Sequence, residues 1–327
     1  MPKSERQKQK LFRILELLME RTDEEHGITV NEIISALSEY GIKAERKSIY
    51  DDFMTLEELG FPVGKLPGRP PSYTLLERVF ELAELKMLVD AVEASRFITA
   101  KKSRDIIEKL SVFAGNYKSR ELSRQVYVED RVKTANSATI YTIDAIHAAI
   151  NSNRQLTFKY FDYDGTGKRI YRHGGATYTV SPCALIWSDA NYYLVAYDEA
   201  AGIVKNYRVD KMSEAAESAL PRTECDAVKK FNPADYSMKI FGMYGGREEL
   251  VTMEFDESLA GVVIDRFGTE NRFIPTDFGF RVTLRVMVSP NFFAWMLGFG
   301  EKARVVTPEP VRREFLEILE KTTKLYK

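Results

Sequence analysis

The sequence predicts a multidomain α+β protein: an N-terminal winged helix-turn-helix, a helical connector, a small antiparallel sheet or barrel, and a C-terminal α+β module. Three observations predict this class. Short amphipathic helical patterns in the first 60 residues precede a stretch rich in proline and glycine. The next fifty residues keep helical periodicity without any proline, and beyond residue 151 the apolar pattern alternates with a period of two.

Bulk properties fit a folded protein of several domains. The chain has 327 residues, of which 44% are hydrophobic and 29% charged, so it can bury a core in each of two or three domains. The formal net charge is only -1, with 47 Lys and Arg residues against 48 Asp and Glu residues. Any contact with nucleic acid must therefore depend on local clusters of positive charge.

The sequence favours a reducing, cytoplasmic location. Cys183 and Cys225 are the two cysteines, and no Cys-x-x-Cys spacing exists, so we expect neither a disulfide framework nor a cysteine metal site. The first residues are charged, and no apolar signal core follows them. No uninterrupted apolar run approaches the roughly 20 residues that span a bilayer.

The first segment, residues 1–75, carries the winged helix pattern. Thr29 and Glu32 have the spacing of a capping box at the start of the second helix. The third helix covers about residues 45–59, and residues 61–75 fit two short strands with a flexible tip. The apolar positions expected to face inward are Leu11, Ile14, Leu15, Leu18, Ile33, Ile34, Leu37, Ile49, Phe53 and Leu56.

Residues 76–139 are expected to form a helical connector between domains. Two apolar stripes at helical spacing run through its first part. Such a face can pack within the chain or against a partner chain, and the sequence leaves both alternatives open. The stripes consist of Leu82, Leu85, Leu88, Val89 and Val92, and of Ile106, Ile107 and Leu110.

Residues 140–225 and 245–327 are the two remaining predicted domains. The first begins with a helix over 140–151, after which apolar and polar residues alternate in several short runs separated by turn residues. A polar stretch over 214–248 is expected to be a linker. The second domain is expected to alternate strands and helices and to end in a long helix.

The winged helix pattern places basic residues where such a fold presents them to a DNA duplex. Arginine can bond both acceptors of a guanine edge, lysine and serine hold phosphates, and tyrosine can do either. Lys10 belongs to a basic cluster with Lys3, Arg6, Lys8 and Arg13 on and before the first helix. The residues expected to contact DNA are Arg46, Lys47, Ser48, Tyr50, Lys65, Arg69 and Lys10.

An opposing observation keeps an alternative open. Residues 1–75 hold 11 Lys and Arg residues against 13 Asp and Glu residues, so DNA binding requires the acids to face away from the duplex. Asp51 and Asp52 are acids early on the reading helix, although Asp52 can cap or pair with a base on the core side. The alternative is a winged helix that makes protein contacts while its basic residues are solvated.

Two family resemblances refine this interpretation. Residues 46–53, with Leu56 and Gly60 behind them, resemble the Arg-Thr-Ile-x-Arg-Asp-x-x-x-Leu pattern of DeoR-like winged helices. This sequence departs from that pattern at Asp51, where the family often carries arginine. The resemblance therefore implies no grip on the DNA backbone by that side chain.

The second resemblance is to the WYL-domain transcriptional regulators. Tyr192-Tyr193-Leu194 is similar to the motif that names the family, residues 181–185 resemble its proline-containing strand, and residues 205–212 resemble its Arg-x-Phe-Arg-Leu-Asp-Arg-Ile segment. Lys205 and Lys211 each replace an arginine and lose its bidentate geometry. Residues 298–308 look like the extension that often follows this domain. The resemblance covers nearly the whole chain in one order.

The WYL resemblance implies a fold and a role for residues 140–225. The family's central domain is a small barrel of the Sm-like, SH3 type. It is regarded as a sensor for a nucleotide, an oligonucleotide or another anionic ligand. The resemblance also implies homodimers in which the sensor controls DNA binding.

A barrel face that carries tyrosine and arginine suits an anionic ligand with a ring, because rings stack and guanidinium groups hold phosphates. Alternation places Tyr207 and Arg208 on opposite faces, so we assign Arg208 to the ligand and Tyr207 to the core. The tyrosines can instead simply fill the core, and Arg208 can pair with Asp210. The candidate ligand contacts are Lys159, Tyr160, Tyr193, Lys205 and Arg208.

Catalytic signals are weak, and we expect no catalytic residue, cofactor or metal. The three histidines, His26, His147 and His173, are too few and too scattered for a metal site. The chain contains no Gly-x-Ser-x-Gly, P-loop or Gly-x-Gly-x-x-Gly motif. The leading hypothesis is a ligand-responsive DNA-binding regulator. A non-catalytic scaffold that binds protein or single-stranded nucleic acid through the barrel is the second, and a nucleotide enzyme is the least favoured.

Overall fold

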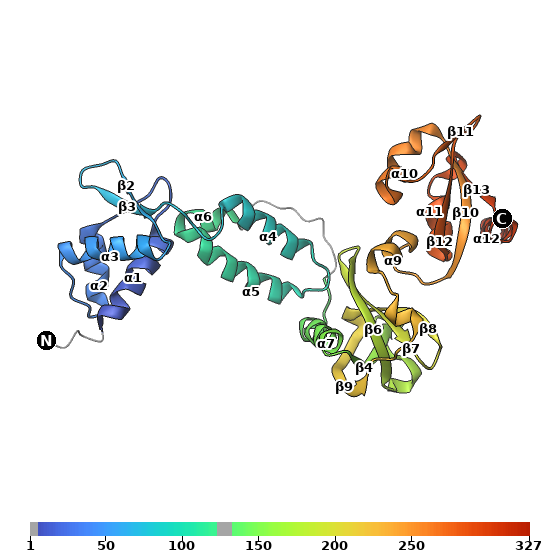
Figure 1. Cartoon of the computed structure of the whole chain (residues 1–327), viewed down its shortest axis with the longest axis horizontal. Helices are drawn as coiled ribbons and strands as arrows, with labels where there is room; N and C mark the ends of the chain where they lie inside the picture. Colours follow the sequence, from blue (N-terminus) through green and yellow to red (C-terminus); the bar gives the residue numbers. More distant parts are fainter. Residues whose placement is uncertain (1–5, 123–132) are drawn as a thin grey trace. The chain divides into compact units, whose positions relative to one another are not determined.

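The computed structural model describes residues 6–122 and 133–327, and the chain divides into two compact units, Met1–Ser137 and Ala138–Lys327 (Figure 1). Within these described ranges, no helix combines the length and the apolar character needed to cross a membrane. The architecture confirms the predicted multidomain α+β class.

The first unit begins with a winged helix-turn-helix. Three helices precede a β-hairpin, and the two-residue strand between the first two helices completes a three-stranded sheet of order β1-β3-β2. Thr29 and Glu32 form the predicted capping box at the start of α2. Ile14, Ile49 and Phe53 lie in the shared core. The elements are α1 (Arg6–Arg21), β1 (Ile28–Thr29), α2 (Val30–Glu39), α3 (Arg46–Glu58), β2 (Val63–Leu66) and β3 (Ser72–Leu75).

Helices α4 (Leu82–Ala94), α5 (Ala100–Ser111) and α6 (Gly115–Leu122) form the predicted helical connector. They pack around a small core that contains Leu85 and Val89. This helical group contacts the winged helix through α6, where the Tyr117 ring stacks on His26 with 3.9 Å between the ring centroids. The winged helix and the connector therefore pack together within the first unit.

The second unit begins with α7, which covers a six-stranded curled sheet. Strand β4 pairs with β5, β6 and β9, and the remaining strands continue in the order β6-β7-β8. Register shifts in the β4–β9 and β6–β7 pairs bend the strands. The sheet therefore curls into a half-barrel around a core that includes Leu156 and Leu194. The elements are α7 (Thr139–Asn151), β4 (Arg154–Tyr163), β5 (Arg169–Tyr171), β6 (Tyr178–Ser188), β7 (Asn191–Asp198), β8 (Ile203–Arg208) and β9 (Met212–Pro221).

The expectation of a linker over 214–248 is wrong. Strand β9 runs through its first part, and α8 (Asp226–Lys229) and α9 (Pro233–Lys239) follow. Most side chains of β9 are exposed, so the strand lacks the apolar alternation that would have revealed it. Helix α9 places Tyr236 against Val195 of the curled sheet, in a cluster of buried apolar side chains.

The C-terminal module is a four-stranded antiparallel sheet of order β11-β12-β10-β13. The alternation of strands and helices and the strand order are those of a ferredoxin-like fold. Its apolar face packs against helices, with Phe255 and Phe292 fully buried between them. The elements are β10 (Arg247–Phe255), α10 (Ala260–Phe267), β11 (Ile274–Thr276), β12 (Gly279–Val288), α11 (Pro290–Leu297), β13 (Ala303–Thr307) and α12 (Glu309–Lys324).

Candidate nucleic-acid interface and candidate ligand site

The first turn of α3 is the exposed basic end of the winged helix. Ile49 and Phe53 point into the core, which turns the side chains of Arg46 and Lys47 outward, and both are exposed. The N-cap residue Glu45 makes no side-chain capping bond. This end of α3 thus presents a guanidinium and an ammonium group to solvent.

Lys10 does not lie on the surface as expected for a DNA contact. Its side chain is buried, with Nζ 2.6 Å from Asp52 Oδ2, and it also donates a hydrogen bond to Ser48 Oγ. Burial raises the pKa of Asp52, and the bond from Lys10 acts in the opposite direction. Lys10 and Ser48 therefore bond to one another inside the domain. Asp52 pairs with a basic residue on the core side, which is one of the two roles that the sequence left open for it. Lys3 and the side chains of Arg6 and Lys8 lie outside the described residues.

Tyr50 joins the outer face of α3 to the hairpin. Its ring lies edge-on to Tyr73 of β3, with 6.0 Å between the ring centroids. Hydrogen bonds with Tyr73 and then with Arg46 lower the pKa of Tyr50. Tyr50 thus fixes the position of the wing relative to the first turn of α3.

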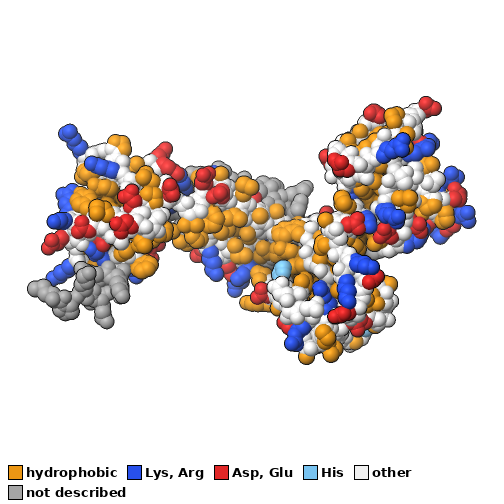
Figure 2. Space-filling model, viewed as in Figure 1, with side chains coloured by type: hydrophobic (Ala, Val, Ile, Leu, Met, Phe, Trp, Pro, Cys, Tyr) orange, Lys and Arg blue, Asp and Glu red, His pale blue; other side chains and the backbone are white. Residues whose placement is uncertain are grey.

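The wing carries the other two expected basic contacts. Lys65 of β2 and Arg69 of the connecting turn are both exposed. Figure 2 shows Lys and Arg side chains interspersed with acids over the winged helix. Two acids of the winged helix are engaged within the first unit: the buried Asp23 accepts the backbone N–H groups of residues 25 and 26 in its own turn, and Glu24 pairs with Lys118 of α6.

In the curled sheet, Tyr193 and Arg208 are directly paired across β7 and β8 and share one face. Arg208 Nε lies 3.0 Å from Asp210 Oδ1, and Nη2 lies 2.7 Å from Oδ2. Nη2 also donates to Asn191 Oδ1 at 3.1 Å, and 37% of the arginine side chain stays exposed. The hydrogen bonds to Asp210 raise the pKa of Arg208, which holds the guanidinium charge in place.

Tyr160 and Tyr207 lie on the opposite, inner face. The Tyr160 hydroxyl accepts a hydrogen bond from the backbone N–H of Arg208 at 3.1 Å, and burial raises the pKa of Tyr160 to about 12. The Tyr207 hydroxyl donates to Asp198 Oδ2 at 3.1 Å. Both rings pack in the core, as expected for Tyr207, so Tyr160 exposes little surface to a ligand.

The two lysines of the expected ligand site have partners in separate places. Lys205 Nζ lies 2.7 Å from Asp198 Oδ2, on the same face as Tyr207. Lys159 Nζ lies 2.7 Å from Glu214 Oε2 of β9. The structure therefore brings Tyr193 and Arg208 together and distributes Lys159, Tyr160 and Lys205 over other parts of the sheet.

A second basic and aromatic group lies beside Tyr160, and the sequence reasoning missed it. The guanidinium carbon of Arg172 is 5.1 Å from the Tyr160 ring centroid, and the His173 ring is 5.6 Å from that of Tyr178. Tyr178 stacks on Phe158 at 5.4 Å and is only partly buried. We call Tyr160, Arg172, His173 and Tyr178 the aromatic rim. Its sequence signal is the run of basic and aromatic residues over 169–173.

Asp162 orients the positive charge of the aromatic rim. Its Oδ2 lies 2.6 Å from Arg172 Nε, and its Oδ1 lies 2.7 Å from Lys211 Nζ. The hydrogen bond from Lys211 lowers the pKa of Asp162, and the bond from Arg172 lowers it further against the effect of burial. Two cations therefore share one carboxylate, which leaves a local excess of positive charge. Within residues 6–122 and 133–327, no three His, Cys, Asp or Glu side chains lie together as a group that could hold a metal ion.

Two family models match the second unit, one over the curled sheet and one over the C-terminal module. The family described as the WYL domain matches residues 141–217, and the family described as the WCX domain matches residues 247–323. A search of curated proteins found no match.

A comparison with solved structures gives two similar chains. Proteasome accessory factor B/C (PafBC) of Arthrobacter aurescens is 19% identical, with a TM-score of 0.29; the alignment covers 94% of this chain and 47% of that one. A CRISPR Cas-related protein is 12% identical, with a TM-score of 0.39, and the coverages are 75% and 70%. The chain thus spans about half the length of PafBC.

Proposed function

We propose that this chain, which carries a WYL domain followed by a WCX domain, is a transcriptional regulator that binds duplex DNA through its winged helix-turn-helix. The observation that carries the proposal is the exposed pair Arg46 and Lys47 in the first turn of α3. In helix-turn-helix proteins the N-terminal residues of the recognition helix contact base edges in the major groove.

In this proposal the exposed basic side chains contact different parts of the DNA. Arg46 suits bidentate bonding to guanine, and Lys47 suits a phosphate. Lys65 and Arg69 reach a phosphate or the minor groove from the wing, whose position Tyr50 fixes through Tyr73. Lys10 and Ser48 are left out of this surface because they bond to one another and, through Lys10, to Asp52.

We further propose that the WYL domain senses an anionic, ring-bearing ligand and thereby modulates DNA binding. The aromatic rim supports this, because Arg172 supplies positive charge and His173 a second ring beside the partly exposed ring of Tyr178. Tyr193 and Arg208 on the outer face are the second candidate contact. A nucleotide or a short oligonucleotide has the matching chemistry.

Genome-wide footprinting of the tagged protein, followed by fluorescence anisotropy on the recovered duplex, tests the regulator proposal. We expect discrete sites, and two half-sites about 34 Å apart, or a multiple of that spacing, would indicate a two-fold homodimer. Salt-insensitive association with a protein, without any duplex binding, would instead favour the scaffold. That outcome has support in the nearly balanced charge of residues 1–75, with 11 basic against 13 acidic residues.

A further inference from the structure

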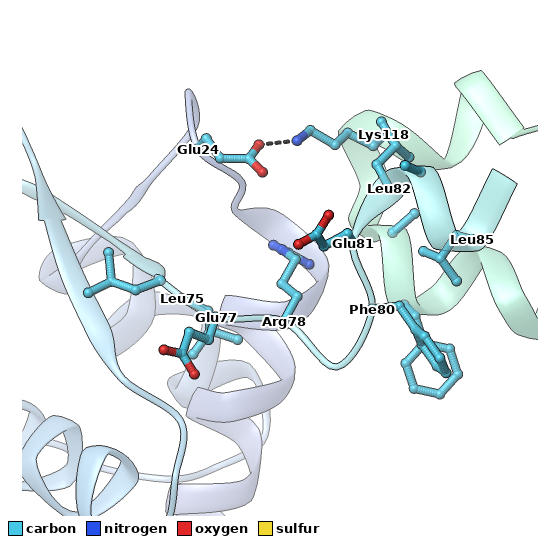
Figure 3. A pocket seen from close by; sticks show the side chains of 13 residues that line it. Glu24, Leu75, Glu77, Arg78, Phe80, Glu81, Leu82, Leu85 and Lys118 are labelled. Atoms are coloured by element: carbon cyan, nitrogen blue, oxygen red, sulfur yellow. Dashed lines mark hydrogen bonds and ion pairs between the residues drawn. The ribbon is translucent and has the colours of Figure 1, made fainter. Parts of the chain in front are cut away.

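A cavity of about 530 Å³ lies in the first unit where the end of the winged helix meets the connector (Figure 3). Its volume falls within the range of small-molecule sites, roughly 300–1,000 Å³. Leu75 and Glu24 belong to the winged helix, whereas Leu85 and Lys118 belong to the connector. A molecule in this cavity would contact both parts at once.

One side of the cavity carries a positive side chain, Arg78, whose guanidinium group is hydrogen-bonded to the protein backbone. Arg78 donates from Nη1 to the Met19 carbonyl at 3.0 Å and from Nη2 to the Thr22 carbonyl, at the C-terminal end of α1. Burial lowers the pKa of Arg78, and attraction from the carboxylate of Glu24 opposes this effect. A ligand carboxylate beside Arg78 would compensate the guanidinium charge in the same way.

Negative charge lines the cavity next to this guanidinium. Glu81 is the exposed N-cap of α4 and exchanges capping bonds with Glu84. Glu24 forms an ion pair with Lys118 of α6. Figure 3 shows that Arg78 and Glu81 project into the same part of the cavity, below the ion pair. The lining thus offers both signs of charge within a short span.

The other side of the cavity is apolar. The rings of Phe80 and Phe113 meet edge to face, with 5.6 Å between their centroids and an interplanar angle of 84°. Leu82 and Leu85 extend this wall along α4. Such a wall fits a hydrocarbon or aromatic side chain, because burial there removes apolar surface from water.

We propose that this cavity binds a small zwitterion with an apolar side chain, of the amino-acid class. The ligand carboxylate bonds Arg78, its ammonium bonds Glu81, and its side chain packs on Phe80 and Leu82. Lining of mixed sign disfavours a polyanion or a simple ion. This site is separate from the sensor proposed in the WYL domain, and its test does not require DNA.

Isothermal calorimetry of the full chain with the free L-amino acids valine, leucine, isoleucine, methionine, phenylalanine and tryptophan tests the chemistry. We expect at least one of them to bind with a dissociation constant of about 1 mM or tighter. Its N-acetyl form, which lacks the ammonium, and its decarboxylated amine should each bind about tenfold more weakly or worse. The absence of heat from all six, or equal binding by either altered form, would overturn the proposal.

Three variants locate the site. Ala83 lines the cavity and is exposed on α4, so Ala83→Trp should fill the cavity and reduce affinity about tenfold or more. Ala91→Trp, at an exposed position two turns along the same helix, is the matched control and should bind as wild type does. Glu81→Gln keeps a capping acceptor and should still weaken binding. Unchanged affinity in both Ala83→Trp and Glu81→Gln contradicts the assignment.

Discussion

Lys10 of α1 and Asp52 of α3 form an ion pair inside the winged helix, with 2.6 Å between Nζ and Oδ2 and only 8% and 16% of the two side chains exposed. The pair joins the first helix to the helix that carries Arg46 and Lys47. An acid that opposes DNA binding in the sequence pattern thus acts, in the fold, to hold the reading helix in position.

Lys10→Met should loosen that attachment. Removing one partner of a largely buried pair leaves the other charge uncompensated and costs about 3 kcal/mol. Hydrogen exchange of the α1 and α3 amides in the full chain measures the free energy of local opening. The double variant Lys10→Met/Asp52→Leu should recover at least half of the loss. A single variant within 0.5 kcal/mol of wild type, about the scale of a neutral surface substitution, would show that the pair contributes little.

Lys65→Ala/Arg69→Ala should weaken DNA binding about equally for all sequences. If both side chains contact phosphates, the slope of log affinity against log salt should fall by about two. Lys229→Ala/Lys230→Ala removes two exposed cations at the C-terminal end of α8 and serves as the control. A change of sequence preference with an unchanged salt slope would mean that the wing reads bases instead.

Arg172→Ala distinguishes the two candidate ligand contacts of the WYL domain. Loss of its charge beside Tyr160 should reduce the affinity for nucleotides or short oligonucleotides about tenfold in calorimetry. Arg208→Ala should do so only if the outer face with Tyr193 is the site. Arg154→Ala, which removes a similarly exposed arginine at the start of β4, is the control. If wild type gives no heat with any of these probes, the anionic-ligand proposal loses its support.

Glu254→Gln should destabilise the WCX domain in a pH-dependent way. Burial alone would raise the pKa of Glu254, but the hydrogen bonds from Arg281 and Arg304 outweigh it and lower the pKa. Because the folded-state pKa lies below the unfolded value of about 4.3, the stabilisation is complete above that pH and is lost as the pH falls through the folded-state pKa. At pH 7 we expect a loss of about 2 kcal/mol.

Urea unfolding followed by tryptophan fluorescence in a Trp187→Phe background checks this prediction. Trp295, which packs against the WCX core, is then the one tryptophan left in the sequence. The difference between wild type and Glu254→Gln should shrink below about pH 4. Glu249→Gln, at a more exposed position of the same strand, is the control. A difference that stays constant with pH would rule out the ionised carboxylate as its source.

The parts of the fold that local pattern determines could be predicted from the sequence. Apolar spacing locates the helices of the winged helix, and the capping box of Thr29 and Glu32 marks the start of α2. Alternation along β8 places Tyr207 in the core and Arg208 outside it. Each of these features depends on residues a few positions apart.

The rest depends on contacts between distant residues. Lys10 looks like a surface cation until the packing of α1 on α3 brings it to Asp52. The register of β4 and the turn after β5 bring Arg172 over Tyr160, which no spacing in the sequence indicates. Tyr236 is buried because α9 packs against the curled sheet, although the surrounding stretch is polar.

The most direct test of the central claim is the affinity of Arg46→Ala/Lys47→Ala for the duplex recovered by footprinting, measured by fluorescence anisotropy over a range of salt concentrations. We expect the double variant to lose specific binding while circular dichroism shows an intact fold, and the wild-type affinity to fall steeply with salt. A double variant that binds the same duplex as tightly as wild type would contradict the entry of the first turn of α3 into a DNA groove.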